Sequence, residues 1–410
     1  MSRNVEPEVR VLESETERLQ AMALFRTAMV GLPSVNYPAG RIDDYLEPGR
    51  TYGAFVDGVL AGTVDAFSGE IALPGGARVG HAAVTHIGVL PTHTRRGVLT
   101  ALVHRQLRDA RAGGEVIATL RASEATIYGR FGFGIASWSA ETEIDVRRAS
   151  LRPGAPEGGA VRLVSAPGHW SVLRDTYARN LPTRPGTLDR WSRWWASQEL
   201  RAESNPGPQY VAVHGEAGHE NGFVRYRPVP ADPHQWFSSD SPAVLVDDFF
   251  APSPEAHAGL LRFLLRLDLV DRIRFAELPT DDPMPWLLRD HRAVRVRSVS
   301  DETWLRILDV ERALACRTYE GTGTVTIGVV DPLFPENEGT YAISSGGVAR
   351  SGDPADLRAG VAEVGSVLLG GVTWRELAAA GRVEVRHADA VPTADGLFDW
   401  PTAPFAGTSF

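Results

Sequence analysis

Residues 86–114, HIGVLPTHTRRGVLTALVHRQLRDARAGG, predict a strand, a basic glycine turn and a helix. The strand is the apolar, β-branched run over residues 84–89, and Pro91 ends it. The helix is indicated by apolar residues at spacings of three and four, which place them on one face, and Gly113 with Gly114 ends it. These apolar residues are Leu99, Leu102, Val103, Leu107 and Ala110.

The turn between this strand and helix, Arg95-Arg96-Gly97, has the chemistry of an anion site. The first turn of a helix carries unpaired N–H groups and the positive end of the helix dipole. Gly97 lets the backbone approach a ligand closely, and the two arginines add positive charge for a pyrophosphate. Many helices begin with basic residues, so the turn taken alone also fits an ordinary solvated helix start.

Residues 115–134, EVIATLRASEATIYGRFGFG, repeat the strand and helix pattern. A buried strand is predicted over 116–122, and Ser123 is placed as the N-cap of a short helix that carries Glu124 and Tyr128. When two such strands are parallel, both helix starts lie at the same carboxyl edge of the sheet, where ligands of open α/β sheets bind. Tyr128 is therefore expected near whatever the arginine turn binds.

Two motifs in these stretches, VLPTHTRRGVLTAL (89–102) and ASEATIYGRFGFG (122–134), resemble the coenzyme-A site of GNAT-type acetyltransferases, and specifically the Eis (enhanced intracellular survival) family. The general GNAT turn is Arg/Gln-x-x-Gly-x-Gly/Ala, whereas this chain has Thr94 and Leu99 at the outer positions. The departure at Leu99 is of the kind that Eis-like proteins show. The resemblance implies an α/β (α+β) fold with tandem GNAT-like domains followed by a sterol-carrier-protein-like C-terminal domain.

The resemblance also implies acetyl-CoA as co-substrate and assigns residues to it. The backbone of Ile87, Gly88 and Val89 would hold the pantetheine arm. The pyrophosphate would lie on the turn and the helix start, which comprise Arg95, Arg96, Gly97, Val98, Leu99 and Thr100. Ser123 and Glu124 would make further contacts with the coenzyme.

Two catalytic residues follow from the same resemblance. Tyr128 matches the general acid of the family, and a phenol with a pKa of about 10 is a suitable proton donor to a thiolate. Without the motif, an aromatic ring packed under the turn would be the simpler interpretation. The general base would be the terminal carboxylate of Phe410, whose unperturbed pKa of about 3.3–3.7 would need desolvation or a bridging water.

The last residues of the chain, FDWPTAPFAGTSF (398–410), predict a docked terminus because they are largely apolar. The penultimate residue is Ser409, whereas an acidic residue there would help to hold a polycationic acceptor. Ser409 therefore argues against a preference for aminoglycosides, whereas the acetyl-transfer step does not depend on this residue.

Three domains are predicted: a catalytic, acetyl-CoA-binding GNAT domain over 1–154, a degenerate GNAT-like domain over 155–292, and a sterol-carrier-like domain over 293–410 that supplies the terminal carboxylate. Residues 135–146 are expected to form the last strand of the first domain, and Trp304 to Ile307 to begin the third.

The second domain repeats the strand, turn and helix pattern without arginines in its turn. The turn reads APSPEAHAG (251–259) and carries Glu255, whose negative charge would repel a pyrophosphate. One coenzyme site per chain is therefore expected. The acidic pairs Asp247-Asp248 and Asp281-Asp282 could suggest a metal, but turn and cap roles are more common for such pairs, so no metal is expected.

Length and composition limit the function classes. The 410 residues exceed the roughly 250–300 that single cores reach. The net charge of −9 argues against nucleic acid or an anionic membrane as partner. The single cysteine, Cys316, forbids an internal disulfide and fits a reducing compartment. With no signal-peptide pattern and no run of roughly 20 apolar residues, the protein is expected in the cytoplasm.

Together these observations predict an acetyl-CoA-dependent N-acetyltransferase that acts on amines of small molecules, aminoglycoside- or polyamine-like, or on lysine side chains. The alternative is a lipid- or sterol-binding protein whose GNAT-like domains serve as scaffolds. The family resemblance implies a homo-oligomer, a hexamer. A stripe of Trp191, Trp194 and Trp195 on one helix face is interpreted as core or subunit contact, with a wall of the acceptor pocket as a further possibility.

Overall fold

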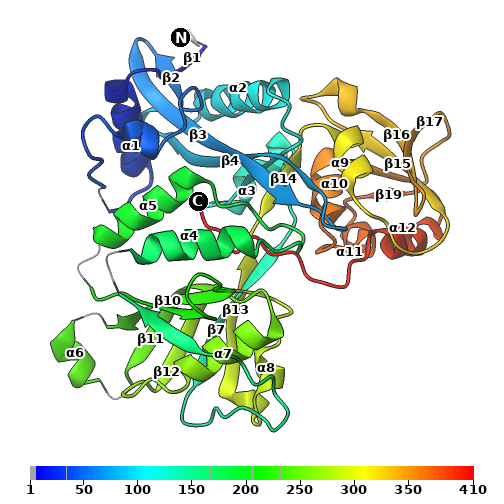
Figure 1. Ribbon diagram of the computed structural model, residues 1–410. Coiled ribbons are helices and arrows are strands. Elements are labelled where there is room, and N and C mark those ends of the chain that lie inside the picture. Colours follow the sequence, from blue (N-terminus) through cyan, green and yellow to red (C-terminus); the bar gives the residue numbers. More distant parts are fainter. Residues whose placement is uncertain (1–5, 34, 166–167, 205–206, 231, 240) are drawn as a thin grey trace. The chain divides into compact units, whose positions relative to one another are not determined.

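A computed structural model describes residues 6–410 except 34, 166–167, 205–206, 231 and 240 (Figure 1). The chain divides into two compact units. One consists of Met1–Ser137, Thr183–Ser197 and Asp301–Phe410, and the other of Trp138–Pro182 and Gln198–Ser300. No helix among the described residues combines the length and the apolar character needed to cross a membrane.

The first unit contains a seven-stranded sheet built mainly from the N-terminal part of the chain. Its strands, in spatial order, are β1 (Glu8–Val11), β2 (Tyr52–Val56), β3 (Val59–Ala72), β4 (Arg78–Val89), β5 (Ile117–Leu120), β14 (Trp304–Ile307) and β6 (Gly134–Ile135). The pairing is antiparallel except between β4 and β5, which are parallel as predicted.

Two helices cover opposite faces of this sheet. α1 (Glu15–Ala28) packs with Phe67 and Ala83, whereas α2 (Val98–Ala112) packs in the cluster of Ala82 and Val84. Successive residues of β4 thus point to opposite faces, as strand geometry requires. The short helix α3 (Ala125–Tyr128) follows β5.

Local signals in the sequence specify several of these elements. Ser14 and Glu17 form a capping box at the start of α1, with the Glu17 N–H donating to Ser14 Oγ over 3.2 Å. Asp57 and Gly58, a residue pair typical of two-residue hairpins, form the turn between β2 and β3. Their φ angles of 52° and 79° are both positive, as the tight hairpin turn of this type requires.

Two strand assignments from the sequence are wrong. Of the single strand expected over 135–146, only β6 lies in the first sheet, while β7 (Trp138–Asp145) belongs to the second sheet. Trp304–Ile307 does not begin the C-terminal domain but is β14, which lies between β5 and β6. Alternating apolar residues predict that a strand forms, but they do not specify its partner.

The glycines of the FGFG motif are explained by this inserted strand. A Cβ atom on Gly132, whose φ is +83°, would lie 2.7 Å from Arg306 Nε of β14. A Cβ atom on Gly134 would lie 2.0 Å from the carbonyl oxygen of Ala362 in α10 (Val361–Leu368). Both positions therefore exclude side chains because other parts of the chain pack directly against the backbone.

The second unit is organised around another seven-stranded sheet. Its order is β13 (Val294–Asp301), β7, β12 (Arg272–Pro279), β11 (Ala243–Phe250), β10 (Gly222–Val229), β9 (Tyr210–His214) and β8 (Val161–Val164). The helices of this unit are α4 (His169–Arg179), α6 (Pro233–Phe237), α7 (Pro254–Leu264) and α8 (Met284–Leu287). The helix α5 (Ser192–Glu203) begins in the first unit and ends in the second. β11 and β12 are parallel and α7 connects them, which confirms the predicted repeat of the strand and helix pattern.

The C-terminal domain has a five-stranded sheet in the order β17 (Gly347–Ser351), β16 (Gly339–Ser344), β15 (Thr324–Val330), β18 (Leu357–Gly360) and β19 (Glu384–Val385). Its other helices are α9 (Val310–Cys316), α11 (Trp374–Ala379) and α12 (Ala390–Phe398). β15 and β16 pair as antiparallel strands. α10 packs against both β18 and the inserted β14, so this domain shares one core with the N-terminal sheet.

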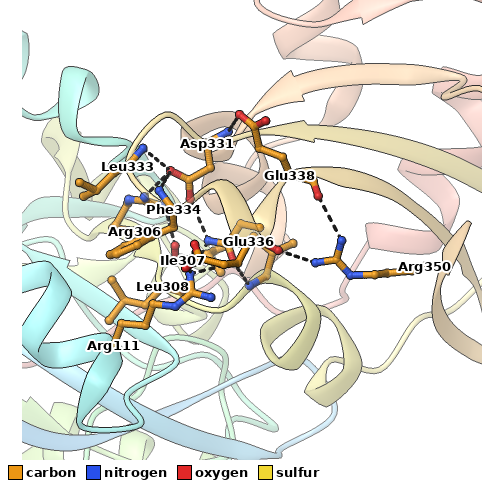
Figure 2. Close-up of polar contacts among 12 residues, drawn as sticks. Arg111, Arg306, Ile307, Leu308, Asp331, Leu333, Phe334, Glu336, Glu338 and Arg350 are labelled. Carbon is orange, nitrogen blue, oxygen red and sulfur yellow. Dashed lines mark hydrogen bonds and ion pairs between the residues drawn. The ribbon is translucent and has the colours of Figure 1, made fainter.

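A buried polar network joins β14 and α2 to the segment that follows β15 (Figure 2). Arg306 of β14 donates to Asp331 Oδ1 over 2.7 Å, and both side chains are almost completely buried. Asp331 Oδ2 accepts from the Asn337 side chain over 2.8 Å. Arg111 of α2 donates to the carbonyl oxygen of Leu308 over 2.9 Å. Burial lowers the pKa of Arg306, and Asp331 opposes that shift.

Candidate active site

The last part of β4, where the coenzyme was expected to bind, has no neighbouring strand on its β5 side in the described structure. β4 pairs with β5 only from His81 to Ala83, yet it continues to Val89. The separation coincides with an irregularity in the ladder between β3 and β4 and with a positive φ of 49° at His86. In the described structure, backbone groups of Ile87–Val89 on this side are therefore not used by a neighbouring strand.

The turn after β4 forms the predicted backbone cradle. Arg95 and Gly97 have φ angles of 62° and 80°, a left-handed geometry that turns successive N–H groups toward one point. Gly97 is the N-cap of α2, and no side chain caps this helix start. A Cβ atom on Gly97 would meet nothing within 4 Å, so the space above the cradle is open. These features fit an anion such as a pyrophosphate.

A cavity of about 730 Å³ adjoins the cradle. Its lining residues are Glu6, Pro7, Arg96, Gly97, Thr100, Ala101, His104 and Arg108. Partial burial lowers the pKa of His104, and the neighbouring Arg108 lowers it further. Arg96 and Arg108 therefore provide the cationic character of the cavity, which suits the phosphates of a nucleotide-containing coenzyme.

Of these lining residues, Arg96, Gly97 and Thr100 were predicted from the sequence, whereas His104 and Arg108 were not. The sequence did contain a signal for His104 and Arg108. Positions 97, 101, 104 and 108 are spaced by three or four residues, which places them on the same helix face as the glycine turn. Of the other predicted contacts, Arg95 is exposed, Val98 is buried under the turn, and Leu99 is half-buried.

Tyr128 lies at the end of α3 and is 5% exposed. It belongs to the same apolar cluster as four of the predicted coenzyme contacts, namely Ile87, Val89, Val98 and Leu99. Burial raises the pKa of Tyr128 above its ordinary value of 10.0, Ser123 lowers it through a hydrogen bond, and the charge of Glu124 raises it. The phenol is therefore protonated at neutral pH.

Ser123 does not have the capping role that the sequence predicted for it. The N-cap position of α3 is Glu124, and no side chain caps the helix, so the prediction of Ser123 as N-cap is wrong. Ser123 instead forms a hydrogen bond with Tyr128. Both residues are exposed, and Glu124 accepts from Thr126 Oγ1 over 3.1 Å.

The C-terminal tail is docked, as predicted. After α12 it returns to the N-terminal sheet and ends at the point marked C (Figure 1). The N–H groups of Ala406 and Gly407 donate to Glu302 over 3.1 Å. Arg190 donates to the carbonyl oxygen of Gly407 over 2.7 Å and to Thr408 Oγ1 over 3.1 Å.

Phe410 is half-buried, and its ring packs on the α1 face of the sheet. The ring centroid lies 6.3 Å from that of His81 and 5.8 Å from that of Trp191. Burial lowers the pKa of His81 to about 3, so this histidine is neutral. Tyr128, in contrast, belongs to the cluster on the α2 face.

The tryptophan stripe holds this tail. Trp191 precedes α5 rather than lying on it, and its ring stacks on Phe67 at 5.3 Å. Trp194 Nε1 donates to the carbonyl oxygen of Ser409 over 2.7 Å. Trp194 and Trp195 are 6% and 2% exposed within their own chain. The core interpretation is confirmed for these two residues, because their side chains are buried within their own chain.

Asp65 and His86 form a pair that the sequence did not reveal. Asp65 is completely buried on β3 and lies 3.2 Å from His86 Nδ1. Its other oxygen accepts from Thr51 Oγ1 over 3.1 Å. The His86 ring packs between Phe25 and Phe67 at 5.1 and 6.5 Å, on the same face as Phe410. The pair is thus a second group that could accept a proton on this face. No group of acidic, histidine or cysteine side chains suited to a metal occurs among the described residues.

The corresponding helix start in the second unit differs from that of α2. Ser253 caps α7 by accepting from the Ala256 N–H over 3.1 Å, and Pro254 occupies the first helical position. Glu255 places a negative charge in the first turn. This helix start is therefore already satisfied by its own side chain and would repel a phosphate.

Coenzyme A should therefore bind at one equivalent per chain in a calorimetric titration, and Gly97→Glu should weaken that binding at least about 100-fold. The added carboxylate would enter the cradle, where two like charges about 4 Å apart repel by about 4 kcal/mol before screening. Gly114→Glu is the matched control, because Gly114 has a similar φ of +89° and open space at the opposite end of α2. Saturation at two equivalents would contradict the single-site prediction.

Three family models match the chain. Residues 8–136 and residues 186–307 each match the acetyltransferase (GNAT) domain. Residues 310–407 match the sterol carrier protein domain. The predicted order of two GNAT domains followed by a sterol-carrier-like domain is thereby confirmed.

Relatives extend this similarity over the whole length. An uncharacterised N-acetyltransferase of Streptomyces avermitilis is 34% identical over 100% of both chains. The N-acetyltransferase Eis of Mycobacterium bovis is 32% identical over 80% of each chain. Among solved structures, Eis1 from Mycobacterium abscessus is 47% identical with a TM-score of 0.91, covering 98% of this chain and 100% of that one. A GCN5-related N-acetyltransferase from Anabaena variabilis shares the fold at 19% identity and a TM-score of 0.83, covering 99% of this chain and 100% of its own.

Proposed function

Because the chain belongs to the Eis family of GNAT N-acetyltransferases, we propose that it transfers the acetyl group of acetyl-CoA to an amine of a small molecule or of a lysine side chain. The observation that carries this proposal is the uncapped, basic start of α2, which shares an apolar cluster with the buried phenol of Tyr128. Polyamine- and aminoglycoside-like amines are the small-molecule acceptors to test first.

We assign coenzyme binding to three segments of the first domain. The open edge of β4 at Ile87–Val89 would hydrogen-bond the pantetheine arm. The N–H groups and side chains of Arg95–Thr100 would hold the pyrophosphate. Ser123 and Glu124, which directly precede α3, would make further contacts with the coenzyme. The coenzyme supplies the acetyl thioester.

The reaction needs two proton transfers besides the bond changes. The amine nitrogen bonds to the acetyl carbon, the C–S bond breaks, and the leaving thiolate takes up a proton while the amine loses one. We assign the donated proton to Tyr128, because its raised pKa keeps the phenol protonated. We assign acceptance of the amine proton to the terminal carboxylate of Phe410, directly or through a water.

The two assigned groups belong to clusters on opposite faces of β4. Tyr128 shares its cluster with Ala82 and Val84, and Phe410 packs with Ala83 and Phe67. This arrangement supports a division of the site, with the thioester approaching from the α2 face and the amine from the α1 face. The two faces would communicate beyond Ala83, the last residue of β4 that pairs with β5.

The finer features of the chain belong to the same proposal. The domain over 1–154 is catalytic, the domain over 155–292 binds no coenzyme, and the domain over 293–410 supports the terminal carboxylate. Two strands cross these sequence bounds: β7 lies within 1–154 but belongs to the second sheet, and β14 lies within 293–410 but belongs to the first sheet. Assembly into a homohexamer is proposed from the family resemblance, and a cytoplasmic location from the single cysteine, which fits a reducing compartment.

Free thiol should be released from acetyl-CoA when the purified protein is offered amines from a panel of polyamines, aminoglycosides and lysine peptides. Two residues added after Phe410 should leave coenzyme binding intact but remove most of the turnover. The addition displaces the carboxylate by up to about 7 Å, which is beyond hydrogen-bond reach.

The same two residues added at the N-terminus provide the control. No thiol release across the panel would contradict the proposed acceptors. Full activity in the C-terminally extended protein would exclude the terminal carboxylate as base and transfer that role to His86, which Asp65 orients.

A further inference from the structure

Glu302 is a completely buried carboxylate that the proposed mechanism does not use. It lies just before β14, and its own N–H donates to the carbonyl oxygen of Ser137 over 2.9 Å. The next residue, Thr303, accepts from Ala136 and donates to Ser137 Oγ over 2.8 and 3.2 Å. The backbone that carries Glu302 is thus fixed against the end of the N-terminal sheet.

The carboxylate of Glu302 binds the tail by its backbone. Oε1 accepts from the N–H groups of Ala406 and Gly407, each over 3.1 Å, and Oε2 accepts from Ala406 over 3.1 Å. These donors precede the chain terminus by only a few residues. Hydrogen bonds between an ion and N–H groups are about twice as strong as neutral ones, and burial strengthens them further.

The same carboxylate also holds the loop that leads to Tyr128. Arg121, directly after β5, donates to Glu302 Oε1 over 3.0 Å and to the carbonyl oxygen of Thr408 over 3.3 Å. Ser137 Oγ donates to Glu302 Oε2 over 2.6 Å. Arg121 therefore contacts both the tail and the carboxylate that anchors it, seven positions before Tyr128 in the sequence.

We propose that Glu302 is a positioning residue that fixes the last residues of the chain, and with them the terminal carboxylate, relative to the segment that carries Tyr128. This inference rests on the proposed function, in which Phe410 accepts the amine proton. A buried charge is retained at this point because several donors converge on it, and removal of the charge leaves those donors without an acceptor. A shift of about 1 Å in a catalytic group can lower turnover by about 100-fold.

Glu302→Gln tests this assignment, since glutamine keeps the shape but replaces one oxygen by a donor. Hydrogen exchange at the Ala406 and Gly407 amides should become about 10- to 100-fold faster. The kcat should fall by up to about 100-fold, while the Kd for coenzyme A stays unchanged. Ser137→Ala removes one hydrogen-bond donor to Glu302 but keeps the carboxylate charge. It should therefore accelerate amide exchange and lower kcat by smaller factors than Glu302→Gln, and it tests the assignment if the glutamine variant folds poorly.

Glu115→Gln is the matched control, because Glu115 is 9% exposed and pairs with Arg50 at 2.7 Å, apart from the tail. Unchanged exchange at Ala406 and Gly407 in the Glu302 variant would overturn the inference. Faster exchange with unchanged kcat would overturn it as well. The C-terminal extension then separates the role of Phe410 from the role of Glu302. If the extended protein is inactive, Phe410 remains the base and does not need Glu302 to position it. If the extended protein is active, Phe410 is not the base.

Discussion

Tyr128→Phe should lower kcat by about 10²–10⁴-fold and leave the Kd for coenzyme A nearly unchanged. The substitution removes one hydroxyl from a ring that is 5% exposed, so the packing of the ring with its neighbours is retained. Without the phenol proton, the thiolate leaves unprotonated, and the barrier of that step rises. Steady-state kinetics combined with calorimetric titration of coenzyme A would measure the two effects separately.

The pH dependence provides a second check on the same residue. Burial raises the pKa of Tyr128 above 10.0, so the protonated, active form persists as the pH rises to that value. Loss of kcat through this group is therefore expected only on the alkaline side of 10.0 in the wild type, and this limb should disappear from the residual activity of Tyr128→Phe.

Tyr52→Phe is the matched control for this prediction. Tyr52 is 4% exposed in the same domain and donates to Asp109 Oδ2 over 3.0 Å, away from the cradle. Its variant should lose one hydrogen bond and keep its kcat. An unchanged kcat in Tyr128→Phe would return Tyr128 to a packing role.

Asp331→Ala should destabilise the first unit by about 3–5 kcal/mol, which is the effect expected when one partner of a buried ion pair is removed. The variant would leave the Arg306 guanidinium, with a fully buried side chain, without its carboxylate. It would also remove the acceptor of the Phe334 N–H (Figure 2). The Asn337 side chain would lose one of its two acceptors and keep the carbonyl oxygen of Leu308. The midpoint of denaturant unfolding, compared with that of the wild type, would measure the loss.

An exposed pair in the same domain provides the comparison. Arg358 and Glu384 lie 4.0 Å apart with side chains that are 64% and 73% exposed, so Glu384→Ala should leave the midpoint close to the wild-type value. The double variant Arg306→Met with Asp331→Ala should be more stable than Asp331→Ala alone, because no buried cation remains unpaired. Equal midpoints for Asp331→Ala and Glu384→Ala would show that the buried pair does not stabilise the joint between β14 and the C-terminal domain.

Short-range features of the site could be predicted because their causes lie within a few residues. The helix α2, its glycine start and its C-terminal glycine follow from apolar spacing and from the conformations that glycine permits. The hairpin at Asp57 and Gly58 follows in the same way. The contrast between the two helix starts was also visible in the sequence, since Glu255 stands in the first turn of α7 where the first domain has arginines.

Other features required the folded chain. Glu302 gave no signal in the sequence, yet its partners Ala406, Ser137 and Arg121 lie 104, 165 and 181 positions away. The pair of Asp65 and His86 depends on the register of β3 against β4, which the alternation of apolar residues does not specify. Trp194 was predicted to be buried, but its hydrogen bond to the carbonyl oxygen of Ser409 could not be predicted.

The sequence by itself determined the secondary structure of the coenzyme half of the site and the family to which the chain belongs. Both depend on local motifs, in which spacing, caps and glycines act between near neighbours. Only the tertiary structure decided that β14 lies between β5 and β6, that β7 belongs to the other sheet, and that the tail is anchored by Glu302. The physical reason is that sheet pairing and buried ion contacts are made between distant residues, whose complementarity leaves no periodic pattern in the sequence around them.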